Sequence, residues 1–395
     1  MSGFTNSSDG DLNRIFFSES ELADQFYGVS MWGFGSNGNG RLGDGTTTSR
    51  TSPVTTSGGG TNWKQVASGD AHAAGVKTDG TLWCWGAGGT GRIGDNSTSD
   101  RSSPVTTVAG GTNWKQVACG TSGTTPWTAA VKTDGTLWTW GSNSALQLGD
   151  GGVTTGSKSS PSTTSGGGNT WKQVACGAAY GAAIKTDGSL FLWGSNGSGQ
   201  LGNLTATTSS RNSPVAPSGT NTGWKRVACG ADHTAAVKTD GTLWCWGSNG
   251  SGRLGNNSTT NTSSPVSTSG GGVTWNFVAC GVNHTAAVKT DGTLWTWGEN
   301  TNGKLGDNST SARSSPITVS GGGTDWKTVV GALQHTIAIK TNGAMWSWGD
   351  NTNGKLGDGT TTAKSSPALA TAGLNVYWKS AAGGGNNSAA VGSIN

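Results

Sequence analysis

The sequence predicts an all-β protein, a seven-bladed β-propeller whose blades each contain four short strands. The dipeptide Trp-Gly recurs seven times at intervals of 51 to 55 residues, and such a period is typical of a unit repeated around a ring. A second tryptophan recurs at the same period, 22 to 26 residues before the next Trp-Gly. The two series are Trp32, Trp85, Trp140, Trp193, Trp246, Trp297 and Trp348, and Trp63, Trp114, Trp171, Trp224, Trp275, Trp326 and Trp378.

Each repeat contains signals for four strands. Its first two apolar runs resemble WKQVACG and HTAAVK, and Asp-Gly or Asn-Gly follows the second run in six repeats. These dipeptides favour the positive φ angles of a type I′ turn, so we expect six β-hairpins. A Leu-Trp-x-Trp-Gly run and a Ser-Pro-Val run supply the third and fourth strands. The turns lie at Asp79-Gly80, Asp134-Gly135, Asp187-Gly188, Asp240-Gly241, Asp291-Gly292 and Asn342-Gly343.

The two ends of the repeated region complete each other. Aligned on Trp378, the sequence stops at the turn glycine of a hairpin, and aligned on Trp32 it resumes at Gly28. We therefore predict that residues 27–32 pair with residues 388–395 and close the ring, which removes its open sheet edges. Residues 28–395 form one propeller in this interpretation, and residues 1–27 form a separate leader.

The repeat resembles that of the regulator of chromosome condensation family. That family's unit carries a glycine, a His-Thr pair, Trp-Gly and a Gly-Gln-Leu-Gly-like turn, and this chain has Gly230, His233-Thr234, Trp246-Gly247 and residues 252–255 at these places. Its nearly identical, Ser/Thr/Gly-rich repeats most resemble the homogeneous repeat proteins of bacteria and tailed bacteriophages. The resemblance implies a seven-bladed propeller, a fold that hosts many functions. A light-sensing branch of the family carries Gly-Trp-Arg-His-Thr, which the matching positions here lack.

The reactive residues follow the repeat, which argues against an active site or a metal site. All four histidines share one slot, so we expect hydrogen bonds at strand edges rather than catalysis or metal binding. The cysteines fill two slots without Cys-x-x-Cys spacing, and we expect small buried side chains. No cofactor is expected. The residues are His72, His233, His284 and His335, then Cys119, Cys176, Cys229 and Cys280, then Cys84 and Cys245.

The charged residues also repeat with the blades. Nearly all of the 25 Lys and Arg residues fall into four slots, and we expect rings of solvated charge. Nucleic-acid binding is unlikely on this pattern, because it needs positive charge gathered on one face. No apolar run is long enough for membrane insertion, and no secretory signal begins the sequence, which favours a cytoplasmic location unless the chain sits on a virion.

Three features depart from the repeat: the divergent residues 204–206 and 216–217, which indicate no function, and two candidate binding sites. The leader is acidic, with a net charge of −4 against +8 for the remainder, and its apolar residues could dock on a partner. The second candidate is an insertion that places Pro126 and Trp127 on a loop, where the tryptophan either anchors a ligand or packs on its own blade. The candidate docking residues of the leader are Ile15, Phe16, Phe17, Leu22, Phe26 and Tyr27.

Because no single blade is elaborated, we predict a non-enzymatic structural or binding propeller. The resemblance to phage repeat proteins suggests a virion surface or tail-associated component, tethered to a larger assembly by its leader and binding a host surface protein or glycan. The alternative is a regulatory propeller that acts on a small GTPase or another protein partner.

Overall fold

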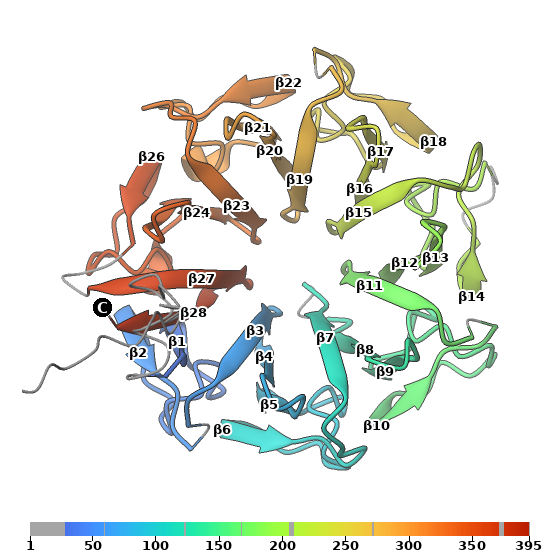
Figure 1. Cartoon of the computed structure of the whole chain (residues 1–395), viewed down its shortest axis with the longest axis vertical. Helices are drawn as coiled ribbons and strands as arrows, with labels where there is room; N and C mark the ends of the chain where they lie inside the picture. The colour runs from blue at the N-terminus through green and yellow to red at the C-terminus, as the bar shows by residue number, and fades with distance from the viewer. Residues whose placement is uncertain are drawn as a thin grey trace, which may run out of the picture.

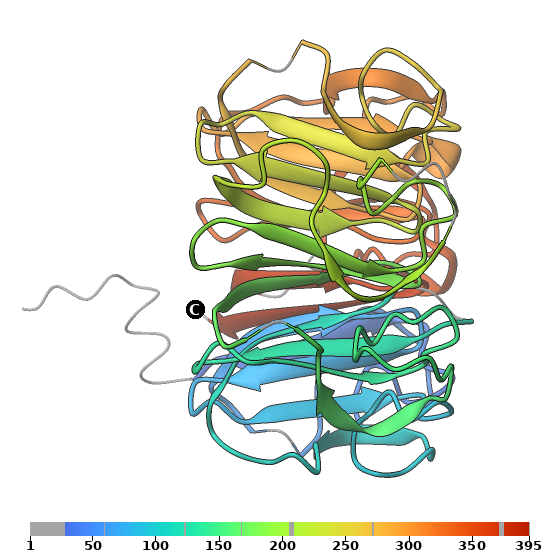
Figure 2. The same cartoon turned by 90° about the vertical axis from the view of Figure 1, so that its right-hand side faces the viewer.

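The chain folds into seven antiparallel sheets of four strands arranged around a central channel, as Figure 1 shows in a computed structural model. The structure describes residues 28–394 except 59, 122–123, 167, 205–208, 271 and 371–374. The predicted leader, residues 1–27, therefore lies outside the described residues. The predicted fold class is confirmed, and the sheets form a thick disc when seen edge-on (Figure 2).

We number the blades from the first complete sheet. Blade 1 contains β3 (Trp63–Ser68), β4 (His72–Lys77), β5 (Leu82–Gly86) and β6 (Arg101–Thr106). Blade 2 contains β7 (Trp114–Cys119), β8 (Trp127–Lys132), β9 (Leu137–Gly141) and β10 (Lys158–Thr163). Blade 3 contains β11 (Trp171–Cys176), β12 (Tyr180–Lys185), β13 (Leu190–Gly194) and β14 (Arg211–Val215).

The next three blades repeat this order. Blade 4 contains β15 (Trp224–Cys229), β16 (His233–Lys238), β17 (Leu243–Gly247) and β18 (Thr262–Ser267). Blade 5 contains β19 (Trp275–Cys280), β20 (His284–Lys289), β21 (Leu294–Gly298) and β22 (Arg313–Thr318). Blade 6 contains β23 (Trp326–Gly331), β24 (His335–Lys340), β25 (Met345–Gly349) and β26 (Lys364–Leu369). Short 3-10 turns, η1 (Thr301–Gly303) and η2 (Thr352–Gly354), follow β21 and β25.

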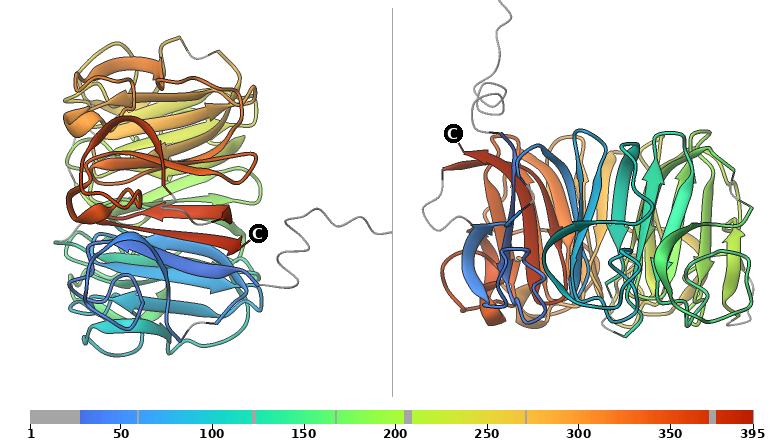
Figure 3. Two further views of the ribbon diagram at one scale, coloured as in Figure 1. Left: turned by 90° about the vertical axis from the view of Figure 1, so that its left-hand side faces the viewer. Right: turned by 90° about the horizontal axis from the view of Figure 1, so that it is seen from below.

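Blade 7 joins the two ends of the chain and closes the ring. Its strand order is β2 (Arg50–Thr55), β1 (Ser30–Gly35), β28 (Asn387–Ile394) and β27 (Val376–Gly383). Figure 3 shows the first and last described strands side by side. The predicted closure is confirmed, and no blade is left with an unpaired inner strand among the described residues.

The register of this closure differs from the prediction by a few residues. Ser30 pairs with Gly392 and Gly35 with Asn387, just as Gly86 pairs with His72 in blade 1. Phe34-Gly35, rather than Trp32-Gly33, therefore fills the Trp-Gly slot of blade 7. Phe34 is fully buried, and Trp32 takes the place of the first tryptophan in Leu-Trp-x-Trp.

The hairpin turns also differ in type from the prediction. In blade 1 the Gly80 N–H donates to the Lys77 carbonyl, and Gly80 has a φ of +79° whereas Asp79 is not among the positive-φ residues. One positive-φ glycine after a type I turn defines a bulged three-residue hairpin rather than a type I′ turn. The Asp79 carboxylate accepts from the Thr81 N–H and hydroxyl and so fixes the turn from inside.

Tryptophans and lysines form the packing layers between the blades. In blade 1 the Lys77 ammonium lies over both Trp63 and Trp83, at 5.1 and 4.7 Å from the ring centroids. Arg50 and Asp44 form an ion pair at 2.9 Å after β1, and equivalent pairs recur around the rim. The cations of these two slots thus stack on aromatic rings or pair with the repeated aspartates, and the paired side chains remain 35–40% exposed at the rim.

Candidate functional site at the channel mouth

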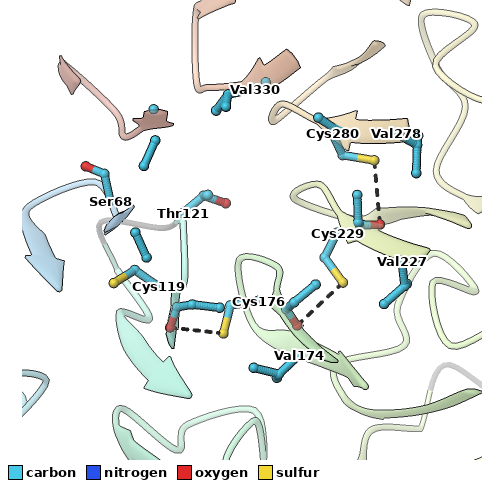
Figure 4. A pocket seen from close by; sticks show the side chains of 18 of the residues that line it. Ser68, Cys119, Thr121, Val174, Cys176, Val227, Cys229, Val278, Cys280 and Val330 are labelled. Carbon is cyan, nitrogen blue, oxygen red and sulfur yellow. Dashed lines mark hydrogen bonds between the residues drawn. The ribbon is translucent and has the colours of Figure 1, made fainter. Parts of the chain in front are cut away.

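The inner strands line a channel whose cavity measures about 250 Å³. Figure 4 shows four cysteines around it, with Ser68 on the remaining side. The Cys176 thiol donates to the Ala118 carbonyl of the preceding blade at 3.5 Å, and Cys229 and Cys280 make equivalent contacts. Burial raises the pKa of the Cys229 thiol to about 12. These thiols are therefore protonated structural groups, as the sequence predicted, and they lack the thiolate character of a nucleophile.

Side chains that reach from one inner strand to the next connect the blades around the channel. The Gln65 side chain donates to the Val117 carbonyl and accepts from the Val117 N–H, at 2.9 and 3.0 Å. Gln116 and Gln173 do the same one and two blades later. In blade 4 the slot holds Arg226, whose guanidinium stacks on Phe277 at 4.6 Å. Arg226, which fitted no repeat slot in the sequence, thus takes the place of the glutamine.

The histidine slot forms a second set of contacts between blades. The His72 Nε2 lies 2.9 Å from the Thr128 Oγ1 of blade 2, and that hydroxyl donates to the Arg92 carbonyl of blade 1. The same relay recurs at His233, His284 and His335, with Ser388 replacing threonine in the last case. The predicted hydrogen-bonding role of these histidines is confirmed.

The relay fixes the protonation state of each histidine. Because the threonine proton goes to the carbonyl, the threonine oxygen must accept from Nε2–H, so Nε2 carries the single ring proton. The Nδ1 atoms are buried without a partner. Burial, with a neighbouring cation, lowers the pKa of His72, His233 and His335 to about 3. Burial also lowers the pKa of His284 well below its ordinary value.

Three blades place another residue in the histidine slot. Trp127 begins β8, is fully buried and donates from its indole N–H to the Gly177 carbonyl at 3.2 Å. Pro126 is buried as well. The prediction of an exposed binding loop at Pro126 and Trp127 is therefore wrong, because the insertion ends before the slot. Tyr180 and Asn387 complete the set, and each bonds to the following blade.

A polar ring surrounds the channel mouth, where the loop after the third strand of each blade meets the loop between the first two strands of the next blade. Its cations and amides stand before the repeated Leu-Gly or Ile-Gly, and five of them bond to the next blade. The Arg41 guanidinium donates to the Asp70 carbonyl at 2.8 Å, and the Arg253 guanidinium donates to Asn283 at 2.7 Å. We call this set the latch residues: Arg41, Arg92, Gln147, Gln200, Arg253, Lys304 and Lys355.

Carboxylates pair with several latch residues, although no spacing in the sequence indicated such pairs. The fully buried Lys304 ammonium lies 3.3 Å from Glu299, and the equally buried Lys355 contacts Asp350. These carboxylate side chains remain 23% and 17% exposed, so solvent meets the acids rather than the lysines. Desolvation lowers the pKa of Lys304, and the nearby Glu299 carboxylate opposes that shift.

The charge around the mouth is not evenly distributed. Cationic latches occupy blades 4 to 7 and blade 1, where the mouth acids also lie, whereas blades 2 and 3 carry the neutral Gln147 and Gln200. We call the first sector the charged arc. Its carboxylates are Asp70, Asp100, Asp232, Glu299 and Asp350.

No group of three or more His, Cys, Asp or Glu side chains that could hold a metal ion occurs among the described residues. The described residues also include no helix with the length and hydropathy that crossing a bilayer requires.

The fold and the repeated slots define a propeller built from regulator of chromosome condensation repeats. Family models confirm this: the RCC1-like domain matches residues 124–394, and the RCC1 repeat matches residues 30–76 and 79–125. The chain belongs to the RCC1-like family.

Two curated relatives are about a third identical to this chain over the residues that align. The ultraviolet-B receptor UVR8 of Arabidopsis thaliana is 32% identical over 305 residues, which cover 76% of this chain and 68% of the receptor. The human E3 ubiquitin-protein ligase HERC2 is 32% identical over 207 residues, half of this chain but only 4% of that protein.

Solved structures of more distant sequence confirm the fold. Yeast RCC1 (Prp20), in its complex with Kap60, superposes with a TM-score of 0.81 at 19% identity, covering 100% of this chain and 96% of that one. Human WBSCR16 superposes with a TM-score of 0.80 at 21% identity, covering 93% and 98%. At these identities the likeness concerns the fold alone.

Proposed function

We propose that this chain is a non-enzymatic regulatory or scaffolding propeller that binds a protein partner at the charged arc of its channel mouth. The supporting observation is the asymmetry of that ring: five blades carry ionic groups where two carry amides, on an otherwise repeated scaffold. The acids are more exposed than the lysines that pair with them. The contact surface of the partner is therefore basic, since complementary charge directs association.

Relatives with the same fold are described as protein binders. The yeast structures show Prp20 bound to Kap60 and concern its binding to Gsp1p and histones. A small GTPase, the alternative partner predicted from the sequence, is one candidate for this chain. We propose binding rather than catalysis, because we identify no cluster of catalytic groups among the residues that the structure describes.

Carbodiimide cross-linking tests the proposal directly, because it joins carboxylates to lysines in contact. We expect cross-links between the partner in its native complex and Asp100, Asp232 or Glu299. Asp100→Asn with Asp232→Asn should weaken the complex. The matched control changes Asp79→Asn and Asp134→Asn, which lie in exposed turns at the opposite ends of the strands. Cross-links confined to those turns would exclude the charged arc as the contact surface.

The leader remains a second proposed contact, based on its sequence alone. Its apolar and acidic composition supports docking of Ile15, Phe16, Phe17, Leu22, Phe26 and Tyr27 on a larger assembly, which would be a virion if the phage-like style of the repeat reflects its origin. A host surface protein or glycan would then be the external ligand. Removal of residues 1–26 should leave the propeller folded and abolish incorporation into that assembly, and unchanged incorporation would exclude the leader.

A further inference from the structure

A groove of about 450 Å³ lies on blade 4 where the connection from blade 3 crosses it. It is distant from the channel mouth and has no part in the function proposed above. The loop that borders it, residues 216–223, has Pro217-Ser218-Gly219-Thr220 where most other blades have a run of glycines. Trp224, Lys238 and Trp244 form one wall, and Ser264 and Pro265 of β18 form the other.

The loop leaves a buried donor without a partner. In blades 1, 2 and 6 the indole N–H of the anchor tryptophan donates to a loop carbonyl, at 2.9 Å for Trp63 and Trp114 and 3.3 Å for Trp326. The corresponding N–H of Trp224 is buried and has no acceptor, as in Trp171, Trp275 and Trp378 of blades 3, 5 and 7. The features that set blade 4 apart are therefore the course of its loop and the position of its second tryptophan.

A contact with the neighbouring blade accounts for the position of the loop. The Asn221 side-chain oxygen accepts from the Leu190 N–H of blade 3 at 3.1 Å. This bond draws the loop toward blade 3, and Ser218, Gly219 and Thr220 line the groove instead of closing on the indole.

The second tryptophan of blade 4 also differs from its equivalents. In the six other blades the anchor tryptophan meets the aromatic ring of this slot edge to face, with centroids 5.7 to 6.4 Å apart. The ring contact that the structure records for Trp224 is with Trp246 instead. Trp244 is partly exposed and lines the groove, and the Lys238 ammonium lies between the two indoles, 4.7 and 5.5 Å from their centroids.

We propose that this groove binds an acidic saccharide, a pyranose that carries a carboxylate. The face of Trp244 offers a flat apolar surface for the C–H side of a sugar ring. The hydroxyls of Ser218, Thr220 and Ser264, which line the groove, suit the sugar's hydroxyl and ring oxygens. The Lys238 ammonium supplies the positive charge that selects the carboxylate.

Titration calorimetry on the full chain tests the proposal with two probes. The probes are a uronic-acid trisaccharide and the neutral trisaccharide with its carboxylates reduced to alcohols. We expect the acidic probe to bind more tightly, and Trp244→Ala to weaken it at least about tenfold, or about 1.4 kcal/mol. Trp295→Ala, the same slot in blade 5, is the matched control and should leave binding unchanged. Thr220→Trp, on an exposed loop, should block the groove without touching the core.

The lysine is tested separately by Lys238→Met, with Lys289→Met of blade 5 as its control. Lys238→Met should abolish the preference for the acidic probe and leave the neutral one unaffected. Equal affinity of the unaltered chain for both probes would overturn the proposal that the Lys238 ammonium selects a carboxylate. Binding that survives both Trp244→Ala and Thr220→Trp would overturn the site. If neither saccharide binds, or if an acidic peptide binds instead, the proposal that the ligand is a saccharide is overturned.

Discussion

The four buried histidines predict that acid destabilises the ring well above the pH at which carboxylates titrate. Each imidazole is neutral, with its proton on Nε2 and no acceptor near Nδ1. Because burial lowers the folded pKa to about 3 for His72, His233 and His335, from 6.5 in the unfolded chain, only the unfolded chain takes up protons in between. The stability that the neutral rings provide is complete above pH 6.5 and is lost as the pH falls toward the folded pKa.

The expected loss is large compared with the stability of a domain. At pH 5 each of His72, His233 and His335 costs about 2 kcal/mol of unfolding free energy, so the three cost about 6 kcal/mol, and His284 acts in the same direction. Folded domains are stable by about 5–15 kcal/mol. Urea unfolding followed by circular dichroism between about pH 7.5 and pH 5 should therefore show a steep fall in stability, with a slope that approaches four protons.

Single variants separate the histidines from other acid effects. Asn387 occupies the same slot in blade 7, so His233→Asn and His284→Asn are accommodated by the geometry. Each variant should reduce the slope by one proton, whatever stability it loses at neutral pH. A stability that stays constant between pH 7 and pH 5 in the unaltered chain would refute the neutral tautomer and the relay built on it.

Three further predictions concern closure, the histidine slot and metals. A chain that ends before Val376 loses β27 and β28 and exposes the edge of β1, so it should aggregate on heating, and a melting curve like that of the full chain would contradict closure. Trp127→Ala should cost about 3–5 kcal/mol in urea unfolding, because the ring is fully buried, whereas a change smaller than about 1 kcal/mol would show that it contributes no packing. Dialysis against a chelator should leave the melting temperature unchanged, and a fall of several degrees would indicate a metal ion.

The fold was predictable because the spacing of the repeated tryptophans and turns is kept through all seven repeats, even where single residues differ. Seven periods and an incomplete last hairpin determine the number of blades and the closure. The register at the junction was not determined, because the run Trp32-Gly33-Phe34-Gly35 contains two aromatic-glycine pairs that fit the slot equally well. Only the strand pairing of Gly35 with Asn387 distinguishes them. The Asp-Gly turns failed for a similar reason, since that dipeptide suits both turn types.

Contacts between blades could not be predicted in the same way. Lys304 and Gln334 are 30 residues apart, and their bond exists only because adjacent blades bring the two loops together. A spacing within one repeat carries no information about that geometry. For Trp127 a usable signal was present: its alignment with the histidine slot places it on a strand, and this outweighs the insertion before it.

The latches and relays have a consequence for how variants of this chain behave. Neighbouring blades are bonded at three levels: by a glutamine at the channel in blades 1 to 3, by a histidine in the core in blades 1, 4, 5 and 6, and by a latch at the mouth in blades 3 to 7. Closure leaves no terminal blade that could fray alone, so the cost of breaking one contact is shared by the ring. Residues that differ between blades without altering these bonds, such as the neutral latches Gln147 and Gln200 and the loop at Asn221, are therefore where binding specificity can change without loss of the fold.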